Sequence, residues 1–306
     1  SVIMCVDNIL QRQYVKEVFP YLDTPAEVPI FYQLKANLNE QEVAAMARAN
    51  VKLITPGFES LNSNTLKLMD KGVTAFHNLQ VMKHCTLHDV HPGWNILVGS
   101  PGEPAEVYQK YVHDLPLFVH LPPPQGLFSI HFNRYSPYFM YPEKWGLDLA
   151  PVDYYSLVYP FPPESIWNIA YDWTDQNLEA EYLQALAQWI DPVQEKIRAW
   201  RRKWGEDASV PQPQLYMDQH GEETWIYDSR FDEVREYPVT PAVRQLLLYL
   251  NDARKISSLS TALASVKPNT AVACSPGKRG VHGDERRIQR FGEGLALDYD
   301  VDAISA

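Results

Sequence analysis

The sequence predicts an α/β fold in which parallel strands form a partial, open TIM-like (β/α) barrel, followed by a helical and winged-helix-like region. Short apolar runs alternate with helical patterns, the connections between them are short, and polar residues and glycines follow the runs. Alternating strands and helices indicate a parallel sheet covered by helices, whose site lies at the carboxyl ends of the strands. We expect the barrel over 1–174, a long connecting helix over 175–209, and a hairpin with a winged-helix-like domain over 210–306.

The first half of the barrel is predicted from β-branched runs and helix signals. The opening run 2–6 suits a buried parallel strand, because such strands are covered on both faces. Asn39 is the expected N-cap of one helix, and Gly72 is expected to end another. The strands are expected over 2–6, 28–34 and 51–55, and the helices over 10–19, 39–50, 62–70 and 74–88.

The second half changes in texture. Strands are expected over 94–98 and 116–120 around a helix over 104–112, and the proline-rich and aromatic stretch 121–163 is expected to hold one strand, 127–132, and ordered loop. Pro192 is expected to kink or break a helix over 176–204, whose strip of Trp189, Ile197, Trp200 and Trp204 reads as core. The remaining expected elements are a hairpin of 214–219 and 223–228 turning at Gly221, helices over 240–251, 257–265 and 284–292, and two terminal wing strands.

Composition limits the functions open to the chain. It has 306 residues, a formal net charge of −11 and a pI near 5.3, so nucleic acid is a poor partner. No apolar run approaches the length of a membrane helix, so no membrane partner is expected. The cysteines Cys5, Cys85 and Cys274 form no close pair, which favours a reducing, cytoplasmic setting over a disulfide framework.

Two strand-end segments carry the sharpest signal. The first is Gly57-Phe58-Glu59-Ser60, followed by a helix that ends in Lys71-Gly72, and the second runs from Asn95 to Glu103 (NILVGSPGE). In this order they resemble the radical-SAM superfamily. The resemblance is closest to the cobalamin-dependent members that mature ribosomally synthesised peptides, and the segments 30–37, 129–146, 154–160 and 226–230 share it.

The resemblance implies a binding site for S-adenosylmethionine. Glu59 would hold the ribose hydroxyls, since a carboxylate accepts two donors, and the neighbouring Ser60 would belong to the same site. Gly99 and Pro101, with Asn95 in the same segment, would line the adenosine, where glycine lets the backbone approach closely. Asp7 would lie near the amino group of the methionine moiety and Lys35 near its carboxylate, although a helix cap and a solvated lysine are equally good readings of these two residues.

The resemblance also implies what is missing. The family holds a [4Fe–4S] cluster with a CxxxCxxC loop, and the three cysteines of this chain have no such spacing. We therefore expect residues 1–306 to be the later part of a longer enzyme, inactive alone, whose cluster and cobalamin are held upstream. The whole enzyme would modify, including by methylation, a precursor peptide through a 5′-deoxyadenosyl radical, with a flavodoxin or ferredoxin as reductant.

Other polar residues have a structural reading beside the functional one. Arg134 and Tyr135 belong to a family-like stretch and would contact substrate, but a structural tie between Arg134 and a carboxylate is the simpler interpretation. Glu103 reads as a first-turn helix carboxylate. His84 and His88 lie one helical turn apart, with His91 beyond, yet exposed helix-end histidines are favoured over a zinc site.

Two alternatives stay open. The winged-helix-like tail could be a peptide- or partner-binding module attached to an inert barrel remnant. The chain could also be an unrelated (β/α) barrel with its site near Glu59 and Lys35. A closed eight-stranded barrel would favour that second alternative, and an open arc of five or six strands would favour the radical-SAM reading.

Overall fold

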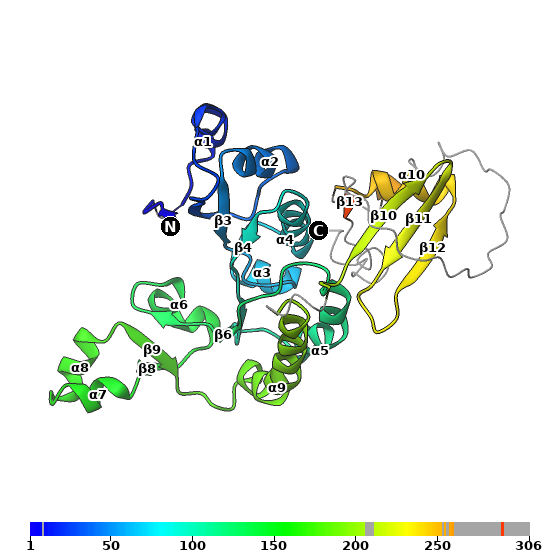
Figure 1. Cartoon of the computed structure of the whole chain (residues 1–306). Helices are drawn as coiled ribbons and strands as arrows, with labels where there is room; N and C mark the ends of the chain where they lie inside the picture. The colour runs from blue at the N-terminus through cyan, green and yellow to red at the C-terminus, as the bar shows by residue number, and fades with distance from the viewer. Residues whose placement is uncertain (8, 206–210, 253, 255–256, 260–288, 291–306) are drawn as a thin grey trace.

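Parallel strands form the centre of the structure, which is a computed structural model (Figure 1). It describes residues 1–7, 9–205, 211–252, 254, 257–259 and 289–290. One sheet has the order β1-β2-β3-β4, and a parallel pair, β5-β6, forms a second. These strands span Ile3–Met4, Ile30–Leu34, Val51–Pro56, His91–Pro92, Ile96–Val98 and Leu127–Ser129. Every pairing within the two sheets is parallel, as the sequence predicts.

Backbone hydrogen bonds join the two sheets. The Gly93 N–H donates to the Ile54 carbonyl over 2.7 Å, and the Leu97 N–H donates to the Glu59 carbonyl over 2.8 Å. Strand β5 therefore runs beside the end of β3 and in the same direction. Among the described residues the strands form an open arrangement, and no closed barrel is present.

The helices between these strands begin and end with local signals. Helix α2 starts with a capping box, in which the Asn39 side chain accepts from the Glu42 N–H and the Glu42 side chain accepts from the Asn39 N–H. Helix α3 ends at Leu68, and Asp70 two residues later, with a φ of +53°, takes the left-handed position that the sequence assigned to Gly72. The helices are α1 (Arg12–Glu17), α2 (Glu40–Arg48), α3 (Ser63–Leu68), α4 (Ala75–Leu87) and α5 (Ala105–Asp114), with a 3₁₀ turn η1 (Phe19–Tyr21).

Two strand expectations were wrong. The first strand is not buried, because β1 lies at the edge of its sheet, and Ile3 and Met4 are 45% and 64% exposed. The run 116–120 is not a strand but part of a 3₁₀ turn, η2 (Leu115–Phe118), with Pro116 in its first turn. A short apolar run does not distinguish a strand from a buried turn. The strand that pairs with β5 is instead β6, in the stretch where one strand was expected.

The proline-rich segment is more ordered than a loop. It forms a small antiparallel sheet in the order β7-β9-β8 with its own apolar core, which includes Phe132, Tyr155 and Trp173. Three short helices start with proline, which is tolerated in the first turn because its missing N–H has no helical partner there. The elements are β7 (Phe132–Asn133), α6 (Pro137–Met140), η3 (Pro142–Trp145), β8 (Leu149–Pro151), α7 (Tyr154–Val158), α8 (Pro163–Ile169) and β9 (Asp172–Asp175).

Helix α9 (Glu181–Arg202) packs against α5 and the parallel strands. Pro192 lies inside this helix and does not end it. The expected core strip is confirmed. Ile197 and Trp200 are buried in the main core, and Trp189 and Trp204 pack against it.

A second antiparallel sheet follows and lies to one side of the parallel strands (Figure 1). The hairpin β10 (Leu215–His220) and β11 (Glu223–Asp228) turns at Gly221, with φ +64°, as expected. A further strand, β12 (Arg235–Val239), pairs with β11, and α10 (Pro241–Tyr249) follows. The expectation of a helix over 284–292 was wrong for Gln289–Arg290, which form the strand β13 and pair with β10. The wing strands and most of 257–265 lie outside the described residues, so the winged-helix domain and the domain boundaries stay predictions.

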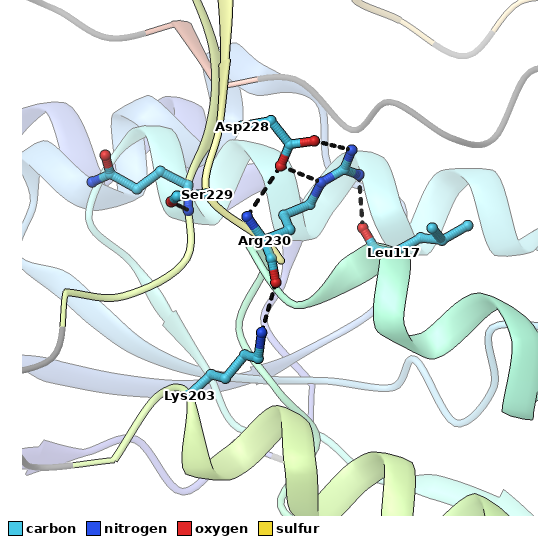
Figure 2. Close-up of polar contacts among 6 residues, drawn as sticks. Leu117, Lys203, Asp228, Ser229 and Arg230 are labelled. Carbon is cyan, nitrogen blue, oxygen red and sulfur yellow. Dashed lines mark hydrogen bonds and ion pairs between the residues drawn. The ribbon is translucent and has the colours of Figure 1, made fainter. Parts of the chain in front are cut away.

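Arg230 connects this antiparallel sheet to the rest of the chain (Figure 2). Its guanidinium donates to both carboxylate oxygens of Asp228, over 2.9 and 2.8 Å, and to the Leu117 carbonyl over 3.0 Å. The Lys203 ammonium, at the end of α9, donates to the Arg230 carbonyl over 2.7 Å. Asp228 and Arg230 are both buried, so they form an internal ion pair, and hydrogen bonds tie Arg230 to η2 and to the end of α9. No described helix is long and apolar enough to cross a membrane.

Candidate functional site

The carboxyl ends of four parallel strands lie side by side and form what we call the carboxyl edge. The Leu10 N–H donates to the Gln33 carbonyl over 2.8 Å, and the Gly57 N–H donates to the Leu34 carbonyl over 3.2 Å. The bond from Leu97 to Glu59 continues the series. The edge therefore brings together four sequence-predicted residues, Asp7, Lys35, Glu59 and Gly99, which follow β1, β2, β3 and β5 respectively. In parallel α/β folds this is where sites form.

Glu59 has a strained backbone. Its φ is +56°, a region that favours glycine, and the Ser60 N–H donates across it to the Phe58 carbonyl over 2.6 Å, which closes a three-residue turn. The fully buried Asn78 donates to the Phe58 and Ser60 carbonyls over 2.9 and 2.8 Å and holds the turn from α4. Holding a non-glycine residue in such a conformation costs about 1–3 kcal/mol, and residues of this kind cluster at functional sites.

The Glu59 side chain reaches the surface of the carboxyl edge. A quarter of it is exposed, and its Oε1 accepts a hydrogen bond from the Lys71 ammonium over 3.1 Å. Its other oxygen has no described hydrogen-bond partner. One carboxylate oxygen is therefore available to a ligand.

Gly99 and Glu103 form the other half of the site. Gly99 has a φ of +76°, which favours glycine, and a Cβ there would lie 3.1 Å from the Leu186 side chain of α9 and press against it. The fully buried Glu103 accepts from the Gly99 N–H over 3.2 Å, the Tyr108 hydroxyl over 2.6 Å and the Thr65 hydroxyl over 2.6 Å. Glu103 precedes the cap of α5, so its reading as a first-turn carboxylate was wrong.

Burial dominates the ionisation of Glu103. It raises the pKa of this carboxyl above its usual value of 4.5, although four hydrogen bonds favour the charged form. The sequence pattern did not identify Glu103, Tyr108 or Thr65 as partners, because they come from α3, the turn after β5, and α5. Their network fixes the turn between Gly99 and α5.

We expect Glu103→Ala to lower the free energy of unfolding by about 2–3 kcal/mol, because the donors of Gly99, Tyr108 and Thr65 lose a buried acceptor. Glu103→Gln is the matched control and should lose less than about 1 kcal/mol, since the Thr65 hydroxyl can accept from the new amide. Urea unfolding measures both.

The pH dependence of Glu103 gives a second readout. A raised folded pKa contributes stability that is complete below 4.5, the unfolded value, and is lost as pH rises through the folded pKa. The glutamine variant should lack this loss. If the stability of the wild-type protein does not fall as the pH rises above 4.5, the raised pKa of Glu103 is contradicted.

The other predicted binding residues differ in accessibility. Ser60 is fully buried and its hydroxyl lies 2.7 Å from the Tyr111 hydroxyl, so it supports the turn from within. Pro101 is also buried. Lys35 is exposed and lines a cavity of about 330 Å³ between β2 and α1, and Asp7 is exposed at the edge strand. Neither Lys35 nor Asp7 has a described hydrogen bond or ion pair.

Asn95 does not join the carboxyl edge. It precedes β5, whereas Gly99 follows this strand, so the two residues are separated by about 13 Å of extended chain. The Asn95 Oδ1 is buried and has no hydrogen-bond partner among the described residues. Asn95 therefore lies at the opposite end of β5 from Gly99.

Arg134 and Tyr135 lie in the aromatic segment. The Arg134 guanidinium donates to the Ala170 carbonyl over 2.7 Å and to the Trp167 carbonyl, at the end of α8, and lies 5.1 Å from the centre of the Phe139 ring. The expected structural tie exists, but it is made to carbonyls rather than to a carboxylate. Tyr135 is 74% exposed and has a φ of +69°.

The described histidines and cysteines form no metal centre. His84 is fully buried rather than exposed, and burial, with Lys83 nearby, lowers its pKa to about 4. Burial raises the pKa of the fully buried Cys85 to about 12, Cys5 is half-buried, and Cys274 lies outside the described residues. No group of three or more potential ligands gathers anywhere in the described part of the chain. The described residues therefore do not fit an iron–sulfur cluster.

Comparison with known proteins gives distant matches among solved structures only. No protein-family model matches the chain, and no curated protein matches it significantly. A solved structure of archaeal Methanocaldococcus infernus Elp3, with residues 1–46 deleted, aligns at 12% identity and a TM-score of 0.33. The alignment covers 70% of this chain and 57% of that one, so the chain spans little more than half of its length. This TM-score is too low to support a shared fold or function.

Proposed function

We propose that this chain is the nucleoside-binding part of a radical-SAM enzyme that modifies, including by methylation, a ribosomally synthesised peptide. The proposal is supported by the two family-like sequence segments and by one structural observation. Glu59, whose backbone is strained, lies beside the strand that leads into Gly99, at the carboxyl edge of a parallel sheet. Fixed backbone strain around a partly exposed carboxylate favours a binding role over a purely structural one.

The described residues fit S-adenosylmethionine in part. Glu59 presents an oxygen without a described partner, which suits the ribose hydroxyls. Lys35 and Asp7 are exposed ends of neighbouring strands and are proposed to hold the methionine carboxylate and amino group. The Gly99 N–H already donates to Glu103, and the absence of a side chain on Gly99 leaves room for Leu186 of α9. We therefore propose that Gly99 shapes the pocket without contacting the ligand. Asn95, Ser60 and Pro101 have no direct role in this proposal.

The cysteines of this chain do not have the spacing of the family's iron–sulfur cluster loop. The radical chemistry that the resemblance implies needs three clustered thiolates, and these cysteines are far apart in the sequence. We propose that the cluster and cobalamin are held by protein outside residues 1–306, in a cytoplasmic enzyme reduced by a flavodoxin or ferredoxin. The roles proposed for this chain are limited to binding and orienting the nucleoside and the peptide, with Arg134 and Tyr135 as candidate peptide contacts.

We expect Glu59→Gly to weaken nucleoside binding without destabilising the protein. Glycine relieves the strain at φ +56°, which offsets its greater backbone entropy and the loss of the Lys71 contact, so the free energy of unfolding should rise by about 0–1 kcal/mol. Binding of adenosine and S-adenosylhomocysteine should fall by about tenfold or more, the size expected for hydrogen bonds to a charged group. Isothermal titration calorimetry and urea unfolding measure the two effects.

The matched variants are Glu59→Gln and Glu222→Gln. The first keeps the shape of the side chain but removes its charge and should also weaken binding. The second removes a carboxylate at the exposed turn of the hairpin and should change nothing. Wild-type protein that binds neither nucleoside, or a glycine variant that binds as well as wild type, would refute the proposed function.

A further inference from the structure

Lys71 is held rigidly beside Glu59. Its N–H donates to the Leu66 carbonyl over 3.0 Å, and the Asp70 N–H donates to the Lys67 carbonyl over 3.1 Å. Together with the left-handed Asp70, these two bonds form the paired C-terminal motif that ends α3. The backbone of Lys71 is therefore fixed, and its ammonium lies 3.1 Å from the Glu59 Oε1.

Stability alone does not explain this ion pair. The two side chains are 33% and 25% exposed, and partly exposed pairs of this kind contribute little to folding. The pair instead joins two rigid backbones, the strained turn at Glu59 and the helix end at Lys71. An ammonium on one carboxylate oxygen leaves a defined direction for the other oxygen.

We propose that Lys71 is a positioning residue for Glu59, which fixes one oxygen of the carboxylate so that the other faces the ribose hydroxyls of the bound nucleoside. The inference rests on the proposed function, because it assigns Lys71 to the same binding site. Binding sites depend on such supporting contacts, since a side chain free to rotate loses part of its affinity. Lys71 acts through Glu59 and does not itself contact the ribose.

A purely electrostatic role would have a different signature. S-adenosylmethionine carries a positive sulfonium, whereas S-adenosylhomocysteine has a neutral thioether in the same place. If Lys71 only added positive charge, its removal would strengthen binding of the sulfonium compound relative to the thioether. If Lys71 positions Glu59, its removal weakens adenosine, S-adenosylhomocysteine and S-adenosylmethionine by the same factor.

The test is calorimetric titration of these three compounds into the full chain. We expect Lys71→Met to weaken all three about fivefold, the size of couplings between contacting residues, with little change in melting temperature. Lys71→Arg should restore most of the affinity. Lys67→Met, which removes the same charge one turn earlier on α3, should bind like wild type. In a Glu59→Gln background, Lys71→Met should cause no further loss.

The failures of the two proposals are distinguishable. Wild-type protein that binds none of the three compounds would overturn the proposed function and, with it, the role of Lys71. Wild-type protein that binds them while Lys71→Met binds equally well would overturn the positioning role alone. A further fivefold loss in the Glu59→Gln background, or a gain that is confined to the sulfonium compound, would also overturn it.

Discussion

Replacing Arg230 by methionine is expected to lower the free energy of unfolding by about 3–5 kcal/mol. The substitution leaves the buried Asp228 carboxylate without its partner and removes the hydrogen bond to the Leu117 carbonyl (Figure 2). An uncompensated buried charge costs more than the ion pair contributes. Urea unfolding of the full chain, followed by circular dichroism, measures the loss.

The pH dependence identifies the ion pair as the cause. Burial by itself raises the pKa of Asp228, but the hydrogen bonds from Arg230 outweigh it and hold this pKa below its usual value of 3.8. A lowered folded pKa contributes stability above the unfolded value, and that stability is lost as pH falls through the folded pKa. Arg230→Met should lack this acid-dependent loss.

Two further variants control for the charge change. Arg198→Met removes an arginine from a solvent-exposed pair with Glu195 on α9 and should leave the stability unchanged within error. The double variant Asp228→Leu with Arg230→Met should recover part of the loss, since no buried charge remains. A single variant as stable as wild type would show that Arg230 does not hold the antiparallel sheet in place.

Local signals predicted the elements whose ends they define. The expected N-cap at Asn39 and the expected glycine turn at Gly221 are both present, because each depends on neighbouring residues alone. The run 116–120 failed because apolar character does not reveal whether a short segment pairs with a strand or turns within the core. The exposure of Ile3 and Met4 follows from the position of β1 at the sheet edge, which no local pattern encodes.

The residues of the candidate site also separate into those that local sequence rules predicted and those that depend on the fold. The strand-end rule placed Glu59, Gly99, Lys35 and Asp7 on one edge, because parallel strands bring their carboxyl ends together. Asn95 belongs to the same sequence segment as Gly99 but precedes β5, whereas Gly99 follows it. The hydrogen bond from Thr65 to Glu103 joins residues 38 positions apart, and the ion pair between Lys71 and Glu59 joins residues 12 positions apart. Only the fold brings such distant residues together.

The second large effect is expected at Trp200, which joins α9 to the core beneath the candidate site. Its side chain is fully buried, its indole N–H donates to the Leu121 carbonyl over 2.8 Å, and its ring meets that of Trp94 edge-on at 6.1 Å. Trp94 in turn lies 5.7 Å from the ring of Phe58, the residue before Glu59. Packing therefore continues from α9 to the strained turn.

Trp200→Ala should lower the free energy of unfolding by about 3–5 kcal/mol, because it opens a cavity and leaves the Leu121 carbonyl without its donor. Trp200→Phe should lose less than half as much stability as Trp200→Ala, since most of the ring contacts survive. Trp167→Ala is the control, because half of that side chain is already exposed and its loss should be smaller. Urea unfolding ranks the three variants, and a loss at Trp167 equal to that at Trp200 would contradict the position of Trp200 in the core.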